Sequence, residues 1–491
     1  MNALLHLIVL LPLLAAIAVL AGAPARQTSL FGSIGALALS LVTAFAYAKT
    51  AGGFQFQSSF PVIAQWDLKY FLGVDGLSLA MVLLSAIVTV SAVWMAPKVD
   101  KQENAFYACL LFISVGAIGA FLSLDLFFFY AFHELALIPT FLLIGIWGSG
   151  ERQLAAWKVT TYLAFGSMVL LVGLLGLYLA FPQEARTFDI PKLYALAEAG
   201  NVFPAKWVFP VLLFGFGTLV SLFPFHTWAP QAYACAPAPA AMLHAGVLKK
   251  FGLYGLLRVA VPLIPGGVES WSWLILVLLI GNILYVGLAT ISQKQLDLTL
   301  GYASVMHMGY IFLGIVSMNS TGFNGAALMM FAHGLMIAAL FALSGVIREK
   351  TGTLDYVDLG GLGQKAPALM FAFGVVTFAS IGLPGFGNFS SEVLVFFGGF
   401  SAGGAKVGPF SLYQITTIIA LWGVVMSAVF MLRAFRQIFF GDLMSRWNEV
   451  GDISVGTKIP VAILTVGLLL FGLYPQLFLN FVGPSLLTLL R

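Results

Sequence analysis

Long apolar stretches fill nearly the whole chain and restrict what it can fold into. Each is about 18 to 25 residues long, which is enough to cross roughly 30 Å of hydrocarbon as an α-helix. Fourteen such stretches can be marked, separated mostly by short turns rich in Gly, Pro or charged residues. They begin near residues 3, 29, 76, 105, 125, 157, 207, 236, 271, 297, 325, 369, 411 and 458. The sequence therefore predicts an all-α polytopic membrane protein with about 14 transmembrane helices.

The composition excludes several other classes of protein. Only 9% of the 491 residues are charged and 60% are hydrophobic, whereas even a large soluble core leaves a mixed polar surface. The net charge of +4 is too small and too scattered for nucleic-acid binding. Cys109 and Cys235 lie far apart and form no CxxC motif. We therefore expect buried thiols, and neither an iron–sulfur cluster nor a metal site in this chain.

The loops carry an uneven distribution of basic residues. If the N-terminus lies outside, the larger share of Lys and Arg falls in the loops after odd-numbered helices, including Lys98, Lys101, Arg152 and Arg348. Cytoplasmic loops of membrane proteins carry such an excess. We therefore expect both termini to face away from the cytoplasm. The first stretch has no charged segment before it, so we interpret it as a retained helix rather than a signal peptide.

The spacing of the predicted helices indicates an internal repeat. Helices four to eight and helices nine to thirteen begin at positions that differ by a nearly constant offset. Because each unit has an odd number of helices, the second copy must enter the membrane from the opposite face. The predicted organisation is a three-helix segment over 1–104, a first five-helix repeat over 105–265, an inverted repeat over 266–440 and a C-terminal helix over 441–491.

Two predicted helices are interrupted in corresponding positions of the two units. The interrupting residues are Pro224, Pro230, Pro237 and Pro239 around helix seven, and Gly382, Pro384, Gly385 and Gly387 in helix twelve. Broken helices expose backbone groups inside the membrane and are tolerated where they line a cavity or a site. Matching breaks in two repeats therefore predict an ion or substrate site.

Ionisable residues inside the predicted helices are functional candidates, because a charge at the membrane centre is costly. Helix five carries Glu134 deep within its apolar sequence, and Asp125 at its start, where a helix cap is the simpler interpretation. Helix eight carries His244, Lys249 and Lys250. Adjacent helical residues point about 100° apart, so we expect at most one lysine to face a central path directly. Lys249 then either belongs to the path or extends toward the membrane surface or a lateral partner.

The remaining candidates are His226 at the first break, His307 in helix ten, His333 in helix eleven and Glu392 just after the second break. Acids, bases and imidazoles distributed over both halves suit a proton path that crosses the protein laterally. The predicted relay consists of Glu134, Lys250, His307, His333 and Glu392, with His226, His244, Lys249 and Asp125 as secondary candidates. We expect no metal and no nucleotide in this chain, since HExxH, GxGxxG and GxxxxGK patterns are missing from the sequence.

At these residues the chain resembles the antiporter-like membrane subunits of respiratory complex I, and within them the subunit M (chain 4) group. The resemblance covers almost the whole chain, and its specificity lies in the order and spacing of the matching strings. These strings are FLGVDGLSL at 71–79, HELALIP at 133–139, PFHTWAP at 224–230, AGVLKKFGLYGLLR at 245–258, GYASVMHMGY at 301–310, AHGLMIAALF at 332–341, LGGLG at 359–363 and GLPGFGNFSSE at 382–392.

The resemblance implies a proton-translocating subunit of NADH:quinone oxidoreductase in the bacterial inner membrane. It implies discontinuous helices seven and twelve, and partners among the other membrane-arm subunits, including sister antiporter-like subunits. FMN, iron–sulfur clusters and quinone are then expected in partner subunits, and no cofactor in this chain. By the same resemblance, Glu134 corresponds to the helix-five glutamate, Lys250 to the central lysine and Glu392 to the helix-twelve glutamate. His307 and His333 correspond to the connecting relay.

One position departs from the family pattern. The family has a lysine in helix seven, seven residues before the histidine of the PFHTW-like motif, and that position here is Leu219. Either Lys249 or His226 then replaces the missing lysine as the partner of Glu134, or this half-channel works differently. The alternatives to the complex I function are a subunit of a cation/proton antiporter or membrane-bound hydrogenase, and a structural spacer in a complex I variant.

Overall fold

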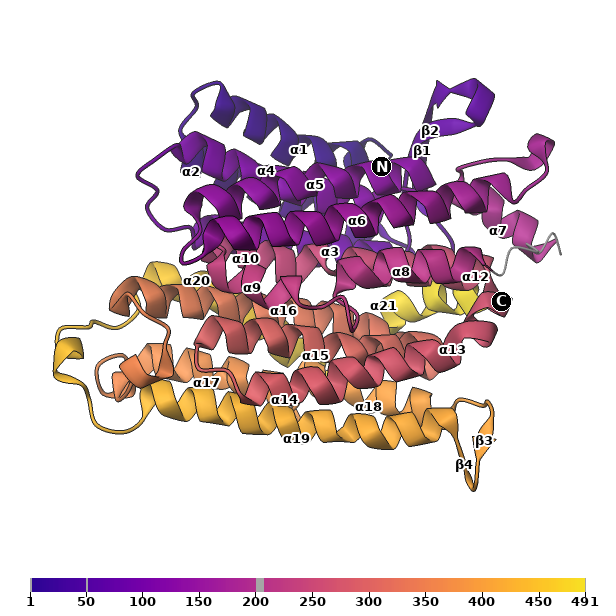
Figure 1. Ribbon diagram of the computed structural model, residues 1–491. Helices are drawn as coiled ribbons and strands as arrows, with labels where there is room; N and C mark the ends of the chain where they lie inside the picture. Colours follow the sequence, from indigo (N-terminus) through magenta and orange to yellow (C-terminus); the bar gives the residue numbers. More distant parts are fainter. Residues whose placement is uncertain (1, 50–51, 200–206, 491) are drawn as a thin grey trace.

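The computed structural model describes residues 2–49, 52–199 and 207–490 and shows a bundle of long, nearly parallel helices (Figure 1). In the described part of the chain, eleven helices are long and apolar enough to cross a membrane. They are α1 (Asn2–Leu20), α2 (Ala25–Ala46), α3 (Gly76–Trp94), α4 (Glu103–Leu122), α5 (Leu126–Trp147), α6 (Arg152–Leu179), α13 (Pro265–Ile280) continued by α14 (Val286–Ile291), α15 (Leu296–Val316), α16 (Ser320–Thr351), α19 (Leu412–Phe439) and α20 (Val455–Leu473). The predicted all-α membrane fold is confirmed.

The three other predicted spans, beginning near 207, 236 and 369, are built from shorter helical segments. The seventh consists of α8 (Val208–Val220) and α9 (Trp228–Cys235), and the twelfth of α17 (Pro367–Ile381) and α18 (Gly387–Ser401). The eighth is α10 (Ala238–Leu243), α11 (Lys250–Gly255) and α12 (Val261–Leu263), joined by π-helical turns at His244–Leu248 and Leu256–Ala260. The predicted breaks in helices seven and twelve are therefore present, whereas the π turns of helix eight were not predicted.

The two breaks share a local geometry. Helix α8 is followed by Ser221 at φ 68°, and α17 is followed by Gly382 at φ 77°, both in the left-handed conformation that ends a helix. Glycine adopts this conformation readily, whereas serine does so only when neighbours hold it. Asn282, in the π turn between α13 and α14, donates to the Ser221 carbonyl at 3.2 Å and accepts from the Phe223 N–H at 2.6 Å. A neighbouring helix therefore stabilises the first break.

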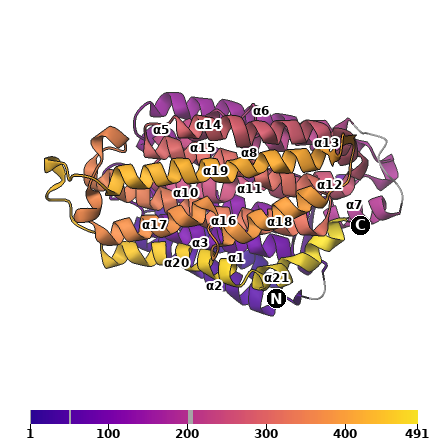
Figure 2. The same ribbon diagram turned by 90° about the horizontal axis from the view of Figure 1, so that it is seen from below.

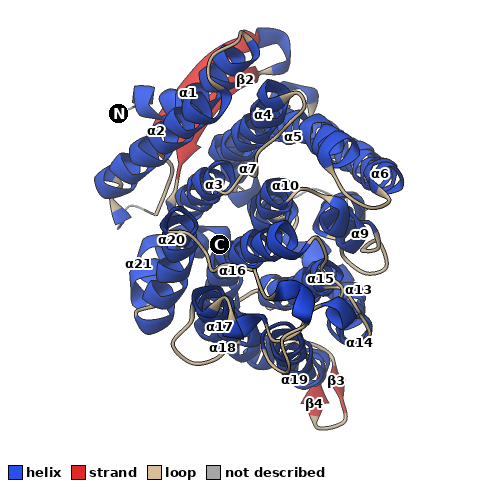
Figure 3. Cartoon of the chain, turned by 90° about the vertical axis from the view of Figure 1, so that its left-hand side faces the viewer, coloured by secondary structure: helices blue, strands red, loops and turns tan. Residues whose placement is uncertain are grey.

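The bundle has an interior and a lipid-facing exterior. Helices α3, α4, α15 and α16 are almost completely buried, and α16 lies at the centre between α3 and α15 when the bundle is viewed along its axis (Figure 3). The outer helices leave large apolar side chains exposed, such as Phe31, Phe45, Phe165 and Trp422. In a membrane these side chains face hydrocarbon, so the exposed apolar surface is the expected one.

Short elements cover the end of the bundle at the right of Figure 1. They are the hairpin β1 (Gln55–Ile63) and β2 (Leu68–Val74), the hairpin β3 (Lys406–Val407) and β4 (Phe410–Ser411), and α7 (Ile190–Glu198). The C-terminal segment over 441–491 was expected to be one helix, but it contains α20 and α21 (Gln476–Leu487), which part at Tyr474 and Pro475. Helix α21 lies near the lower edge of the bundle in Figure 2 and contacts α3 and α16.

The basic loops gather at the opposite end of the bundle. There Trp147 Nε1 donates to the Lys101 carbonyl at 2.9 Å, and Arg348 donates to the Ser149 hydroxyl at 2.7 Å. Arg348 also forms an ion pair with Asp297 at 2.6 Å. The loops that were grouped on one face from their charge are thus joined to one another in the structure.

Candidate functional site

The π turn of helix eight positions two adjacent lysines inside the protein. The N–H of Lys249 donates to the His244 carbonyl at 3.1 Å, five residues back, so the loop closed by this hydrogen bond contains one residue more than in an α-helix. Such turns occur frequently at functional sites. Lys249 and Lys250 are 1% and 0% exposed. Lys249 therefore does not extend to the membrane surface, which had been one of its three predicted placements.

Lys250 contacts the predicted relay directly. Its ammonium group donates to the Ala245 carbonyl at 2.6 Å and lies 3.0 Å from Nδ1 of His333 on α16. An ammonium can only donate, so Nδ1 of His333 accepts whenever Lys250 is charged, and the proton of a neutral His333 ring is then on Nε2. This pair can exchange a proton between an amine and an imidazole without any rearrangement of the backbone.

His307 continues the line from His333 toward helix twelve. The centroids of the two rings are 5.5 Å apart. Nδ1 of His307 lies 2.7 Å from the Ala303 carbonyl, and Nε2 lies 3.3 Å from the Ser380 carbonyl at the end of α17. A carbonyl only accepts, so both contacts are hydrogen bonds only when the ring carries two protons. The two carbonyls can therefore accept hydrogen bonds from both nitrogens of a protonated ring.

Glu392 lies in the second turn of α18 and is buried. Its carboxylate lies against Gly382, the left-handed residue of the break, where a Cβ would collide with Oε2. Glycine is therefore required at this position both for the backbone conformation and for the approach of the carboxylate. The structure brings together Lys250, His333, His307 and Glu392, which are four of the five residues of the predicted relay, around the end of α17.

Glu134 is placed differently from the prediction. It was expected to be buried, but its side chain is 35% exposed on the outer side of α5. It accepts a hydrogen bond from Ser167 of α6 and lies 3.6 Å from Nδ1 of His133. It also lines a groove of about 250 Å³ between α5 and α6. The sequence pattern does not distinguish a glutamate that faces the bundle from one that faces a neighbouring molecule.

Neither Lys249 nor His226 contacts Glu134, which leaves the alternative that this half-channel works differently. Lys249 instead donates to Ser304 of α15 at 3.4 Å and lies 5.6 Å from the centre of the Tyr233 ring. His226 is buried in the first break and stacks on Phe223 at 5.5 Å. The nearest connection from Glu134 toward Lys250 is His133, whose ring stacks on Phe251 at 4.0 Å.

The other two secondary candidates, His244 and Asp125, have hydrogen-bond partners outside the predicted relay. Nδ1 of His244 lies 3.2 Å from the hydroxyl of Tyr233, which places His244 beside Lys249 rather than on the line from Lys250 to Glu392. Asp125 is the N-cap of α5 and accepts from the N–H groups of Phe127 at 2.9 Å and Phe128 at 3.1 Å. The interpretation of Asp125 as a helix cap is therefore supported by its contacts.

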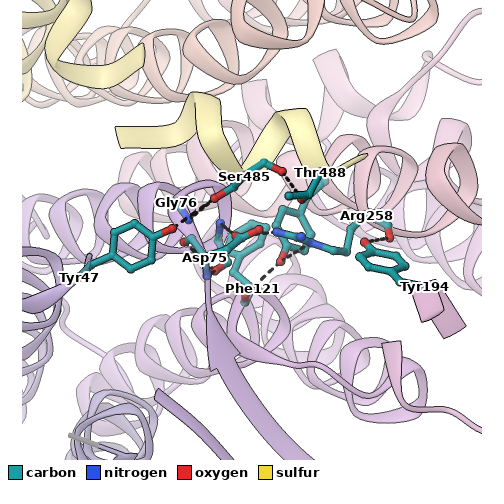
Figure 4. A network of polar contacts seen from close by, with 10 residues as sticks. Tyr47, Asp75, Gly76, Phe121, Tyr194, Arg258, Ser485 and Thr488 are labelled. Atoms are coloured by element: carbon teal, nitrogen blue, oxygen red, sulfur yellow. Dashed lines mark hydrogen bonds and ion pairs between the residues drawn. The ribbon is translucent and has the colours of Figure 1, made fainter. Parts of the chain in front are cut away.

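The ion pair between Arg258 and Asp75 is buried and was not predicted from the sequence (Figure 4). Arg258, at the end of helix eight, donates to Asp75 at 2.7 Å, and both side chains are at most 2% exposed. Asp75 also caps α3 by accepting from the Ser78 N–H, while Tyr194 donates to the Arg258 carbonyl at 2.6 Å. The only sequence signal was a charged residue within each of two apolar strings, Asp75 in 71–79 and Arg258 in 245–258. Residues 183 apart give no indication that they pair.

Across the described ranges, no group of three or more His, Cys, Asp or Glu side chains is arranged to hold a metal ion. The site instead contains one amine, two imidazoles and one carboxyl, which follow one another from helix eight to the break in helix twelve. Broken helices in a bundle of long helices, together with ionisable groups buried inside it, are typical of antiporter-like membrane proteins. The chain belongs to the family described as NADH:quinone oxidoreductase/Mrp antiporter, which matches residues 123–417.

Two relatives of the chain are named as chain 4 of NAD(P)H-quinone oxidoreductase. NAD(P)H-quinone oxidoreductase chain 4 1 of Synechococcus elongatus is 36% identical over 482 residues, which cover 96% of this chain and 88% of the relative. NAD(P)H-quinone oxidoreductase chain 4 of Gloeobacter violaceus is 33% identical over 490 residues, covering 98% and 91%. The expected resemblance to the chain 4 group of complex I is thus confirmed over the length of the chain.

Solved structures share the fold. A chain of respiratory complex I from Thermus thermophilus with bound NADH superimposes with a TM-score of 0.89 and 28% identity, covering 99% of both chains. A chain of the Mrp complex from Dietzia sp. superimposes with a TM-score of 0.85 over all of this chain and 97% of its own length, at 20% identity. The latter likeness concerns the fold alone.

Proposed function

We propose that this chain translocates protons as a membrane-arm subunit of an NADH:quinone oxidoreductase, driven by NADH oxidation and quinone reduction in other subunits. The observation that carries the proposal is the contact of the buried Lys250 ammonium with His333, continued by His307 to the break beside Glu392. The names of the chain 4 relatives supply the driving reaction.

Within this function, Lys250 holds a proton and His333 passes it on. Transfer from the ammonium to Nδ1 leaves a doubly protonated ring, which then releases the proton on Nε2 toward His307. His307 can carry two ring protons between its two carbonyl partners. Glu392 receives the proton at the break and returns to its charged form when the proton leaves the protein. Each step conserves protons and requires no redox group in this chain.

Glu134 is the point at which a neighbouring subunit acts on this path. Its partly exposed carboxylate and the groove between α5 and α6 face outward, where a sister antiporter-like subunit or lipid lies against the bundle. A charge that appears in the neighbour changes the protonation of Glu134, and the Coulomb interaction reaches Lys250 across the His133 and Phe251 stack. The coupling between subunits is then electrostatic.

We also propose an arrangement of inverted repeats and an orientation in the membrane for this chain. The left-handed residues Ser221 and Gly382 end the first parts of helices seven and twelve, which supports inverted repeats over 105–265 and 266–440. The basic loops at one end support a multi-pass arrangement in the bacterial inner membrane with both termini outside. FMN, iron–sulfur clusters and quinone belong to partner subunits.

Isolation of the native assembly tests the function. Membranes are extracted in mild detergent, separated on a native gel and stained for NADH:quinone activity, and the band that contains this chain is analysed by mass spectrometry. We expect comigration with flavin and iron–sulfur subunits and a positive stain. Comigration with small membrane chains alone, or with a nickel hydrogenase, contradicts the proposal and assigns the path to an antiporter or hydrogenase instead.

A further inference from the structure

A buried amide beside Glu392 has no partner in the protein. Asn388 lies in the first turn of α18, one turn before Glu392, and is 0% exposed. Neither its Oδ1 nor its Nδ2 makes a hydrogen bond with the described residues. Buried amides are almost always hydrogen-bonded, because the desolvated donor and acceptor are otherwise costly. Asn388 therefore points to a partner that is not a protein side chain or carbonyl.

Further polar groups without partners come from the helices around the same break. Among the described residues, the hydroxyls of Thr377 and Ser380 on α17, the Tyr310 hydroxyl on α15 and Nε2 of His333 on α16 are buried and make no hydrogen bond. Thr377 and Ser380 are one turn apart and share a face of α17. The Ser380 carbonyl contacts His307 at 3.3 Å, and Gly382 contacts the Glu392 carboxylate. The unpartnered groups are thus carried by helix segments that also contact His307 and Glu392.

Tyr310 contacts the parts of α15 and α18 that carry His307 and Glu392. It lies one turn after His307 on α15, with the two ring centroids 5.9 Å apart. Its ring also contacts Phe396 at 5.4 Å, and Phe396 is one turn after Glu392 on α18. The unpartnered atoms therefore belong to helices that meet at the α17–α18 break rather than to separate parts of the bundle.

The hydrogen-bonding capacity of these groups determines whether a cation or water fits as their partner. A cation would satisfy Oδ1 of Asn388 but leave Nδ2 without an acceptor, and it would leave the hydroxyl protons unused. Water both donates and accepts, and a buried water makes about three hydrogen bonds to such groups. We propose that Asn388, with the hydroxyls of Thr377 and Ser380, holds ordered water that carries the proton from the imidazole pair to Glu392.

This inference rests on the proposed function, because it assigns the last internal step of that path. In the step, a water molecule accepts the proton released by an imidazole and donates one of its own protons to the next water or to the Glu392 carboxylate. The number of protons is conserved, and Asn388 stays neutral throughout. Asn388 is accordingly a positioning residue, since its amide orients the water by accepting one O–H and donating one N–H.

The experiment compares variants in the complete complex reconstituted in liposomes. Asn388→Leu has nearly the same size but no hydrogen-bonding group, whereas Asn388→Ser retains a donor and an acceptor. Glu392→Gln shows how much pumping is lost when the proton path is blocked at its last residue. Thr417→Val is the matched control, because this buried hydroxyl already donates to the Tyr413 carbonyl at 2.7 Å. The measurements are protons moved per NADH oxidised, the uncoupled oxidation rate and the solvent isotope effect in D₂O.

We expect Asn388→Leu to lower the protons moved per NADH to the level of Glu392→Gln, with an unchanged uncoupled rate. Asn388→Ser should restore part of the loss and show a larger isotope effect than Thr417→Val. Normal pumping in Asn388→Leu, with a loss in Glu392→Gln, overturns the water site and leaves the proposed function standing. Normal pumping in both variants contradicts the function itself.

Two further results are decisive. Pumping that requires sodium ions, and that loses this requirement in Asn388→Leu, overturns the inference in favour of a cation site. If Asn388→Leu does not assemble on a native gel, Asn388→Ala, whose side chain also has no hydrogen-bonding group, decides the question. Pumping and an isotope effect equal to those of Thr417→Val then show that Asn388 does not position water on the path.

Discussion

The ammonium nitrogen of Lys250 lies 3.0 Å from Nδ1 of His333, although 83 residues separate the two in the chain. Because Lys250 is on α11 and His333 is on α16, this contact connects helix eight to the central helix of the bundle. It also determines the hydrogen-bonding state of the imidazole, whose Nδ1 must accept while the lysine is charged. The two residues therefore change state together.

Replacement of Lys250 by Met should stop proton transfer through this subunit. Methionine retains the apolar volume but supplies no proton, so we expect transfer to slow by at least about tenfold, which corresponds to roughly 1.4 kcal/mol on the barrier. NADH oxidation with a soluble electron acceptor should not change, because the redox groups lie in other subunits. Proton uptake in inverted membrane vesicles measures the effect. Pumping equal to that of the parent complex would indicate a structural spacer.

Glu134→Gln should reduce NADH-linked pumping and leave assembly intact. The partly exposed carboxylate is held by Ser167 and lies near His133, and a neutral amide keeps these contacts but cannot respond to a charge in a neighbouring subunit. Ser167→Ala is the companion variant, for which we expect a smaller loss. A native gel checks assembly, and the proton-to-electron ratio checks function. An unchanged ratio in Glu134→Gln removes this residue from the coupling.

Breaking the pair between Asp75 and Arg258 should destabilise the subunit strongly. Removal of one partner leaves the other charge buried, and we expect Arg258→Met to cost about 3 to 5 kcal/mol. Exchanging both residues, as Asp75→Leu with Arg258→Met, should recover much of that loss. The exposed pair of Arg446 and Asp358 is the control, and Arg446→Ala should cost less than about 1 kcal/mol. Thermal unfolding in detergent compares them, and equal losses in the two pairs would contradict the prediction.

Asp67 should stabilise the β1–β2 hairpin over the whole physiological pH range. Burial raises the pKa of its carboxyl, but hydrogen bonds from the Lys192 ammonium and the Thr187 hydroxyl outweigh this and lower the pKa from 3.8 to about 2. A depressed pKa contributes stability above the unfolded value, and that contribution is lost only as the pH falls from about 4 toward 2. The loss of stability in Asp67→Asn, measured by hydrogen exchange in 55–74, should be constant from pH 8 to 5. A loss that fades within this range would assign the effect to another group.

The breaks and the central charges could be predicted because they follow from local chemistry. Proline and glycine in two apolar strings indicate interrupted helices, and a lysine or histidine amid hydrocarbon needs a partner inside the bundle. Lys250, His307, His333 and Glu392 were found in this way, and the structure brings them together.

Features that depend on contacts between distant segments of the chain could not be predicted from the sequence. Glu134 faces outward because of the rotation of α5 in the bundle, which an almost uniformly apolar helix does not reveal. The pairing of Asp75 with Arg258 is likewise a property of tertiary structure. The unpartnered amide of Asn388 becomes visible only when every neighbour is in place. The π turn that buries both lysines also has no pattern in its sequence, HAGVL.

The two adjacent lysines should differ in importance. Only Lys250 contacts His333, whereas Lys249 donates to Ser304 at 3.4 Å and lies beside Tyr233. We therefore expect Lys249→Met to slow pumping by less than about tenfold, in contrast to Lys250→Met. If Lys249 acts on the path through Lys250, the double variant should lose no more than Lys250→Met alone, because residues on one path are not additive. Ser304→Ala, which removes the partner of Lys249 and keeps both lysines, should match Lys249→Met or be milder. A double variant with a loss equal to the sum of the two single losses would instead show that Lys249 serves a separate route.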